Sequence, residues 1–221
     1  MTTLAHPTVA SLLDRLFAEA DALAPAAGAV FAGLSETEQD RLMRSRTDYR
    51  DLYGRLKDAP LPVSRETGTL LYMLARGGKA RSIVEFGTSF GISTLHLAAA
   101  LRDNGGGRLI TSEFEPSKVA RAQANLAAGG LADLVEFRAG DALQTLRDDL
   151  PPAIDLVLLD GAKALYPDIL ALLESRLRPG AYIVADNADY SPDYLAYVRS
   201  PAHGYLSTPF GGDVELSIRL G

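Results

Sequence analysis

The most constraining feature of the sequence is a regular alternation, from Arg81 onward, of short apolar runs with segments of helical period. The runs of strand length are Ser82–Phe86, Arg108–Ser112, Leu134–Arg138, Ile154–Leu159 and Tyr182–Ala185. The helical patterns between them are Ile92–Arg102, Pro116–Ala128, Ala142–Asp148 and Asp168–Leu177. Strands that alternate with helices in this way form a parallel sheet covered on both faces, so an α/β fold with a doubly wound, Rossmann-like sheet is predicted.

The two ends of the chain depart from this alternation. At the N-terminal end, a helix through Leu12–Phe17 is expected to stop before Pro25, and a second, begun by a Ser35–Glu38 capping box, to continue to Leu56. A third helix is predicted from Ser64 or Arg65 to Arg76. At the C-terminal end, Gly204–Thr208 and Val214–Leu220 predict an antiparallel hairpin at the sheet edge. We expect a helical cap over residues 1–60 and one larger domain over residues 61–221.

Composition excludes several classes of protein. The chain has 22 Lys and Arg against 28 Asp and Glu, a net charge of −6, which argues against a nucleic-acid partner. It has no Cys, so disulfides, thiolate nucleophiles and sulfur-ligated metals are excluded. Charges interrupt the apolar runs before the ~20 residues of a membrane span, and the N-terminus lacks a secretion signal. A cytoplasmic protein without a membrane partner is therefore predicted.

A glycine turn follows the first expected strand, in Glu85-Phe-Gly87-Thr-Ser89-Phe-Gly91-Ile-Ser93. A dinucleotide fingerprint needs glycines spaced G-x-G-x-x-G, and here Ser89 stands at the middle position, so a pyrophosphate ligand is disfavoured. The acidic Glu85 before the turn suits a ligand with a cationic amino group. Glu113, at the end of the second strand, could accept both hydroxyls of a ribose. A plain tight turn is the alternative for Gly87 and Gly91.

Polar residues also follow the later strands. Gly140-Asp141-Ala142 leaves space for a flat ring beside a carboxylate, although Asp141 could equally be a helix N-cap. Asp160 ends the fourth strand, and Asp186 and Asn187 end the fifth.

Oxygen ligands from adjacent strand ends suit Mg²⁺, and without a cation two buried carboxylates would repel each other. The alternative is that Asp160, Asp186 and Asn187 are helix caps. Lys163 follows Asp160 by three residues and can reach the same rim. Near a divalent cation its pKa would fall and make it a usable base, while the alternative is a structural ion pair with Asp160 or Asp186.

Taken jointly, these motifs resemble those of the cation-dependent class I S-adenosylmethionine (SAM) O-methyltransferases of the catechol and caffeoyl-CoA type. The similarity covers roughly Leu61–Leu220, and its motifs are Val63–Gly68, Val84–Ser93, Glu113, Gly140–Ala142, Asp160-x-x-Lys163-x-x-Tyr166, Leu177–Gly180 and Asp186-Asn187. The resemblance implies a seven-stranded sheet with an antiparallel last strand and a homodimer contact through the N-terminal helices. It implies a cofactor site formed by Val63, Glu85, Gly87, Ser89, Gly91, Ser93, Glu113, Gly140, Asp141, Ala142 and Asp160. It further implies Mg²⁺ on Asp160, Asp186 and Asn187, with Lys163 as the base.

The chemistry explains these residue types. A phenol with a pKa of about 10 is a poor nucleophile at neutral pH, and metal coordination with proton removal by lysine would activate it. A second vicinal oxygen would fill another metal position, which makes a catechol-like small molecule the expected substrate.

Three positions depart from the resembled family: the small Ala162, the turn Gly211-Gly212-Asp213, and the absence of an acidic substrate contact near Thr208. The other functions considered are a metal-independent methyltransferase, a non-catalytic SAM-binding protein and a nicotinamide dehydrogenase.

Overall fold

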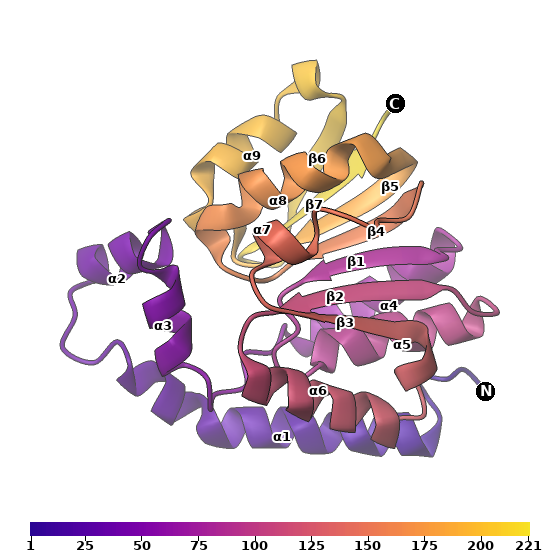
Figure 1. Ribbon diagram of the computed structural model, residues 1–221, viewed down its shortest axis with the longest axis horizontal. Coiled ribbons are helices and arrows are strands. Elements are labelled where there is room, and N and C mark those ends of the chain that lie inside the picture. The colour runs from indigo at the N-terminus through magenta and orange to yellow at the C-terminus, as the bar shows by residue number, and fades with distance from the viewer.

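The computed structural model describes residues 1–221, in which one sheet lies between two helical layers (Figure 1). Its strands are β1 (Ser82–Phe86), β2 (Arg108–Glu113), β3 (Val135–Ala139), β4 (Ile154–Leu159), β5 (Leu177–Ala185), β6 (Tyr205–Phe210) and β7 (Val214–Arg219). Their order in the sheet is β3-β2-β1-β4-β5-β7-β6. Strands β1 to β5 are parallel, whereas β7 pairs antiparallel with both β5 and β6. The predicted doubly wound sheet with an antiparallel last strand is confirmed.

Apolar side chains on the two faces of this sheet hold separate helical layers. One core joins β1, β2 and β4 to α1 (Pro7–Ala29), α4 (Arg65–Gly77), α5 (Ile92–Asp103) and α6 (Pro116–Ala128). The other core joins the sheet to α7 (Ala142–Thr145), α8 (Tyr166–Leu173) and α9 (Pro192–Val198). Short 3-10 turns lie at Ala132–Leu134, Lys163–Leu165, Glu174–Arg176, Ala188–Tyr190 and Pro201–His203. None of the helices combines the length and the apolarity that a membrane crossing requires.

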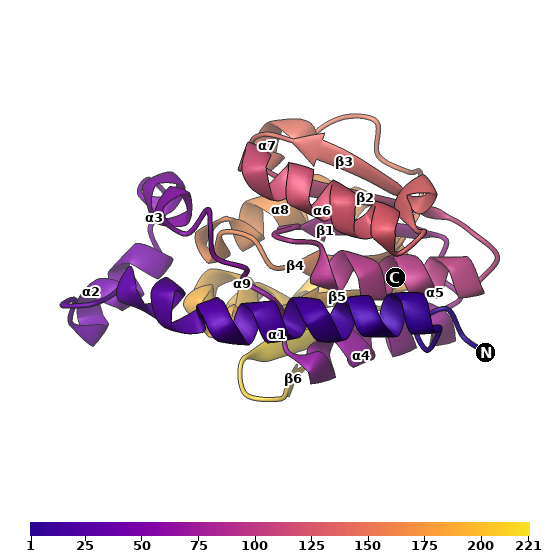
Figure 2. The ribbon, with the colours of Figure 1, turned by 90° about the horizontal axis from the view of Figure 1, so that it is seen from below.

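Two helices stand apart from these layers. Helices α2 (Glu36–Met43) and α3 (Tyr49–Arg55) lie to one side of the sheet, beyond the end of the long α1 helix (Figure 2).

The order of the strands reverses between β1 and β4, since β2 and β3 lie on one side of β1 and β4 and β5 lie on the other. In open parallel sheets, ligands bind at the carboxyl ends of the strands beside such a reversal. Helix α3 closes this end of the sheet.

The N-terminal helices differ from their predicted bounds. Helix α1 runs through Pro25 to Ala29, so the predicted end before Pro25 is wrong. A proline in a helix removes one hydrogen bond, and Pro25 and Asp21 are both exposed, so water can solvate the freed carbonyl. The capping box of Ser35 and Glu38 is confirmed, but the helix it begins ends at Met43.

The chain turns before α3 because the hydroxyl of Ser45 accepts hydrogen bonds from the main-chain N–H groups of Thr47 and Asp48, at 3.3 and 2.9 Å. Such local side-chain bonds compete with helix formation. The expected helix over Ala142–Asp148 is also short and ends at Thr145. Here the guanidinium of Arg138 donates to the carbonyl oxygens of Thr145, Asp148 and Asp149, each at 2.8 Å, and fixes a loop instead. Strand β5 begins at Leu177, where a helix was still expected.

His96 on α5 gives the fold a specific dependence on pH. Its side chain is buried, Gly68 of α4 leaves the space for it, and burial lowers its pKa. The positive charge of Arg65 lowers this pKa further. Below a pH of about 6.5, the ordinary pKa of histidine in the unfolded chain, the unfolded chain therefore binds a proton that the folded chain excludes. The stability of the fold consequently decreases as the pH is lowered.

Below about pH 6.5, we expect the unfolding free energy of the unmodified protein to decrease more steeply with falling pH than that of His96→Gln. The difference between the two slopes should be at most about 1.4 kcal/mol per pH unit. Urea unfolding at pH 7, 6 and 5 measures this difference. Both proteins keep the buried Glu85, whose pKa is raised to about 7 and whose contribution has the opposite sign, so it cancels in the comparison. Parallel pH profiles of the two proteins would contradict the assignment.

Candidate active site

The turn after β1 brings its backbone close to the end of β4. Gly87 has φ +99°, and a Cβ there would lie 2.5 Å from the main-chain oxygen of Asp160. Gly91 has φ +83°, and a Cβ there would lie 2.9 Å from the side chain of Leu126. Both glycines are therefore required by close packing as well as by their left-handed backbone. Gly87 also lines the cavity described next, whereas Gly91 lies outside it and begins α5.

Glu85 lies beneath this turn rather than in the cavity. Its carboxylate is fully buried and accepts hydrogen bonds from the hydroxyls of Ser93, Thr94 and Thr111, each at 2.6 Å. Burial raises the pKa of Glu85 to about 7, against the lowering effect of these hydrogen bonds. Glu85 and Ser93 therefore join β1, β2 and α5 directly under the turn. Their contact with a cofactor amino group remains a prediction of the family resemblance.

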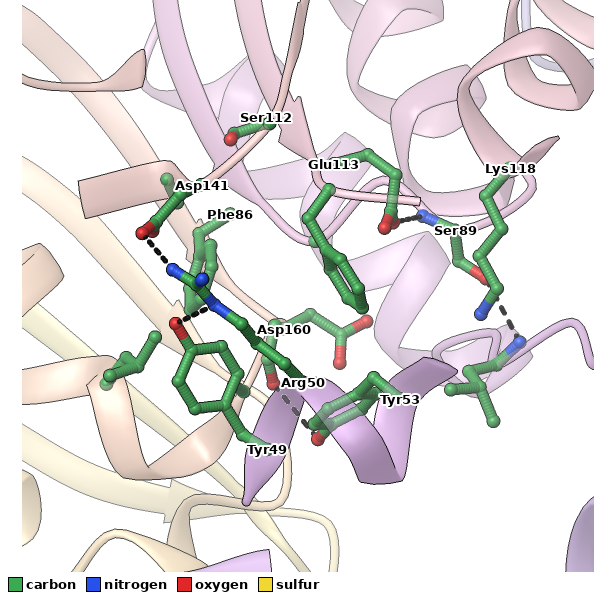
Figure 3. A pocket seen from close by; sticks show the side chains of 18 residues that line it. Tyr49, Arg50, Tyr53, Phe86, Ser89, Ser112, Glu113, Lys118, Asp141 and Asp160 are labelled. Atoms are coloured by element: carbon green, nitrogen blue, oxygen red, sulfur yellow. Dashed lines mark hydrogen bonds and ion pairs between the residues drawn. The ribbon is translucent and has the colours of Figure 1, made fainter. Parts of the chain in front are cut away.

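A cavity of about 270 Å³ opens at the carboxyl ends of β1, β2 and β4 (Figure 3). Glu113 lines it and is nearly buried. One carboxylate oxygen of Glu113 accepts from the main-chain N–H of Ser89 at 2.9 Å, and the other from the N–H of Glu115 at 3.0 Å. These bonds fix the carboxylate, and each oxygen keeps a second lone pair for a ligand. Ser89 has φ +47° and also accepts, at its hydroxyl, a 3.2 Å hydrogen bond from the main-chain N–H of Leu61.

The predicted ring-binding segment forms the opposite wall of this cavity. Gly140, Asp141 and Ala142 all line it. Asp141 accepts a 3.0 Å hydrogen bond from the main-chain N–H of Leu143, which confirms that it is the N-cap of α7. The other carboxylate oxygen of Asp141 pairs with the guanidinium of Arg50 at 2.6 Å. The same carboxylate therefore caps a helix and faces the cavity.

Three side chains of α3 cover this cavity, and the sequence interpretation did not identify them. Tyr49, Arg50 and Tyr53 all point into it in Figure 3. Arg50 also donates to the hydroxyl of Tyr49 at 3.1 Å. Tyr53 is one helical turn beyond Tyr49, and its hydroxyl lies 3.4 Å from the carbonyl oxygen of Gly161. The only signal in the sequence is this pair of tyrosines spaced four residues apart. Lys118 and Phe114 also line the cavity.

Asp160, Lys163 and Asp186 meet at the ends of β4 and β5. The ammonium of Lys163 is 2.8 Å from a carboxylate oxygen of Asp160 and 3.9 Å from one of Asp186. All three side chains are nearly buried, with 5% to 12% of their surface exposed. Burial lowers the pKa of Lys163, but the charges of Asp160 and Asp186 outweigh this effect and hold it well above its usual range. In the protein alone, the lysine is therefore a protonated ion-pair partner.

The carboxylate of Asp186 is only partly compensated by this lysine. Burial and the charge of Asp160 raise the pKa of Asp186 to about 8, against the opposing effect of Lys163. Tyr166 holds the strand end in place, because its buried hydroxyl donates to the main-chain oxygen of Asp186 at 2.8 Å. A second positive charge at this rim would relieve the repulsion between Asp160 and Asp186.

Asn187 is the third predicted metal ligand and lies at the same rim. Its side-chain N–H donates to Asp213 at 2.7 Å, which leaves the amide oxygen free to accept. No three His, Cys, Asp or Glu side chains of the chain form a metal-binding cluster by themselves. The candidate donors at this rim are two carboxylates and one amide oxygen, which are hard oxygen donors of the kind that suits a divalent cation such as Mg²⁺. The Gly211-Gly212-Asp213 turn contributes to this rim through Asp213.

A second cavity, of about 630 Å³, adjoins the first. Lys163, Asp186 and Asn187 lie at one end of it, and side chains of the three N-terminal helices form much of its wall. Val63, expected at the cofactor, lines this second cavity and not the first. Tyr53, Leu61 and Asp160 line both cavities. Ala162, the unusually small residue after β4, lines the first cavity alone.

The known sequences that this chain resembles are methyltransferases. A family model described as a methyltransferase domain matches residues 84–188. A catechol O-methyltransferase of Niastella koreensis is 38% identical over 138 residues, which are 60% of this chain and 62% of the relative. Catechol O-methyltransferase B of Danio rerio is 32% identical over 173 residues, which are 75% of this chain and 64% of the relative. The chain thus spans less than two thirds of the length of the curated relatives it matches.

Solved structures extend the similarity over more of the chain. The O-methyltransferase TomG of Streptomyces achromogenes, crystallised in complex with SAM and involved in tomaymycin synthesis, matches with a TM-score of 0.66 and 28% identity. This match covers 86% of the present chain and 94% of TomG. Cofactor-bound Rv0187 from MTB matches with a TM-score of 0.66 and 26% identity, over 84% of this chain and 96% of that one.

Proposed function

This chain belongs to the class I SAM-dependent O-methyltransferases of the catechol and caffeoyl-CoA type, and from this premise we propose that it transfers a methyl group from SAM to a hydroxyl of a phenolic, catechol-like small molecule. The single observation that carries the proposal is the junction of the two cavities. Asp160 and Tyr53 line both, and Lys163 stands beside this junction. A donor in one cavity and an acceptor in the other would meet next to an acid–base pair.

On the donor side, Glu113 would accept the two ribose hydroxyls with the lone pairs that its backbone contacts leave free. Asp141 and Ala142 would contact the adenine. Gly87 would allow the methionyl chain to pass close to the backbone, above the carboxylate of Glu85. The polar groups are fixed before the ligand arrives, which lowers the entropy lost on binding.

On the acceptor side, the chain would position the phenolic oxygen for in-line attack on the sulfonium methyl group. Asp160, Asp186 and Asn187 would hold a divalent cation. When bound, the cation supplies positive charge that stabilises a phenolate oxygen and offsets the carboxylates that otherwise keep Lys163 protonated. Lys163 would first release its own proton to solvent and would then take the phenolic proton at the neutral Nζ atom. Tyr53 and Leu61 would exclude water from the junction.

A metal-independent methyltransferase is the second candidate, and the ion pair of Lys163 with Asp160 at 2.8 Å favours it. In that case the positive charge of Lys163 would stabilise the developing phenolate without a metal. A non-catalytic SAM-binding protein would need neither Lys163 nor Asp186 at the junction.

A panel of phenols and catechols, assayed for methylation by mass spectrometry with and without EDTA, tests the proposal. We expect methylation of vicinal diols with SAM, at least a hundredfold loss of rate in EDTA, and recovery on addition of Mg²⁺, because stabilisation of the phenolate contributes several kcal/mol. Full activity in EDTA would favour the metal-independent mode. Binding of SAM without methylation of any phenol would contradict the proposal.

Three further features predicted from the sequence are part of the proposal. They are a homodimer contact through the N-terminal helices, a cytoplasmic location, and a division of the chain into a helical cap at residues 1–60 and a methyltransferase domain at residues 61–221. Helix α1 packs on α5 and α6 in the first core, so the cap would be attached firmly to the domain.

A further inference from the structure

The second cavity is far larger than the proposed reaction requires. It has a volume of about 630 Å³, whereas a cavity of about 150 Å³ is enough for one benzene molecule. Its size comes from α1, which presents Ala20, Ala24 and Ala27 to it where larger side chains would fill the space. One aromatic diol at Asp160 and Asp186 would leave most of this volume unfilled.

The wall away from the two strand ends is mainly apolar. Its side chains come from α1, from α2 and from the segments that connect the N-terminal helices to each other and to α4: Phe17, Phe31, Met43, Leu56, Pro60 and Val63. An extended aromatic skeleton attached to the diol would bury its surface against this wall, which is the main source of affinity for an apolar ligand.

The charge of the cavity restricts the ligand further. The carboxylates that line it are Asp21, Asp160, Asp186 and Asp213, and the cations are Arg65 and Lys163. Lys163 is paired with Asp160, while Arg65 lies over the ring of Phe17 and pairs with Asp14 at 3.2 Å. Both lining cations are therefore already engaged, and the cavity offers no free group of cations for the phosphates of an anionic acceptor such as a coenzyme A thioester.

We propose, on the basis of the function proposed above, that the acceptor is an uncharged vicinal diol carried on a skeleton of several aromatic rings. Single-ring catechols fill too little of the cavity, and the phosphates of coenzyme A thioesters find no free cations in it. The N-terminal helices thus determine substrate size, while the strand ends hold the reacting oxygens.

The test compares kcat/KM for catechol, 2,3-dihydroxynaphthalene, 2,3-dihydroxyanthracene and caffeoyl-CoA. We expect an increase of about tenfold for each added ring, because each ring buries more apolar surface, and the lowest value for the thioester. The highest kcat/KM for catechol or for caffeoyl-CoA would overturn the inference while leaving the proposed methyl transfer intact.

Ala24→Phe provides the structural arm of the test, since its ring would fill the cavity from α1. We expect the loss of kcat/KM to be at least tenfold greater for dihydroxyanthracene than for catechol. Ala22→Phe, at an exposed position of α1 outside the cavity, is the matched control and should change neither.

Calorimetric titration of dihydroxynaphthalene, with S-adenosylhomocysteine and Mg²⁺ present, measures the same effect without turnover. Affinity should fall about tenfold in Ala24→Phe and not in Ala22→Phe, and equal affinity in Ala24→Phe and the unmodified protein would overturn the inference. If no diol is methylated, the proposed function fails, and this binding comparison alone decides whether the cavity takes multi-ring diols.

Discussion

Replacement of Lys163 by alanine is expected to lower kcat by a factor of 10² to 10⁴, the usual contribution of a general base. Lys163 is buried at the junction of the two cavities and is the only amine that contacts Asp160 there. Lys163 does not line the first cavity, of about 270 Å³, which is the proposed SAM site and is called the donor cavity below. The affinity for SAM should therefore stay within about threefold of the original value. Initial-rate kinetics and calorimetric titration with S-adenosylhomocysteine measure the two quantities.

Lys163→Arg separates the role of the base from that of the ion pair. Arginine keeps the positive charge beside Asp160 and Asp186 but does not lose its proton in proteins. We expect this variant to retain the thermal stability of the original protein and still to lose most of its activity. Turnover equal to that of the unmodified protein in either variant would remove Lys163 from the mechanism. If both variants lost stability while their folded fraction kept normal specific activity, the role of Lys163 would be structural.

The strand ends were predictable from the sequence for a simple physical reason. In parallel sheets, the carboxyl ends of adjacent strands meet at one edge, so polar residues that follow apolar runs must gather there. Glu113, Asp160 and Asp186 were identified on this basis, and all three lie at the same edge. The bounds of β1, β4 and α6 also agree with the prediction, because clear glycine and proline signals limit them.

The roles of individual side chains were harder to assign. The expected contact of Glu85 with a ligand stays a prediction, but the three hydroxyls from β2 and α5 that donate to its carboxylate were not foreseen. Only the pairing of β1 with β2 and the position of α5 bring these groups together, and neither is a local property of the turn. Asp141 shows the opposite outcome, because its two possible roles, as a helix cap and as a lining residue of the cavity, occur together.

The contribution of α3 could not be predicted, because it depends on contacts between distant parts of the chain. Arg50 reaches Asp141 and Tyr53 reaches Gly161, across separations of 91 and 108 residues. The break at Ser45 that lets α3 turn toward the sheet arises from two side-chain hydrogen bonds, where the periodicity alone favoured one continuous helix. The wall of the acceptor cavity was missed for the same reason, since α1 continues past Pro25.

Removal of the carboxylate of Glu113 should have the largest effect on cofactor binding. Each hydrogen bond to a charged group contributes about 1.5 to 3 kcal/mol, so losing both ribose contacts in Glu113→Ala should raise the Kd for S-adenosylhomocysteine, which carries the same ribose, by at least a hundredfold. Glu113→Gln keeps one acceptor oxygen and the shape of the side chain, and we expect a rise of about tenfold. Calorimetric titration with S-adenosylhomocysteine measures both values without any acceptor present.

Glu115→Ala is the matched control for this series. Glu115 lies two residues beyond Glu113 and caps α6 through the main-chain N–H of Ser117, but it does not line the donor cavity. If the loss of negative charge or a weaker turn lowered the affinity in general, Glu115→Ala would lose affinity as well. If Glu113 contacts the ribose specifically, the Kd of Glu115→Ala should stay within about twofold of that of the unmodified protein. Because Glu113 also fixes the N–H of Ser89, thermal unfolding of Glu113→Ala must be measured beside its affinity. A hundredfold loss of affinity with little change in unfolding temperature assigns the carboxylate to the ligand, and equal losses in Glu113→Ala and Glu115→Ala would refute that assignment.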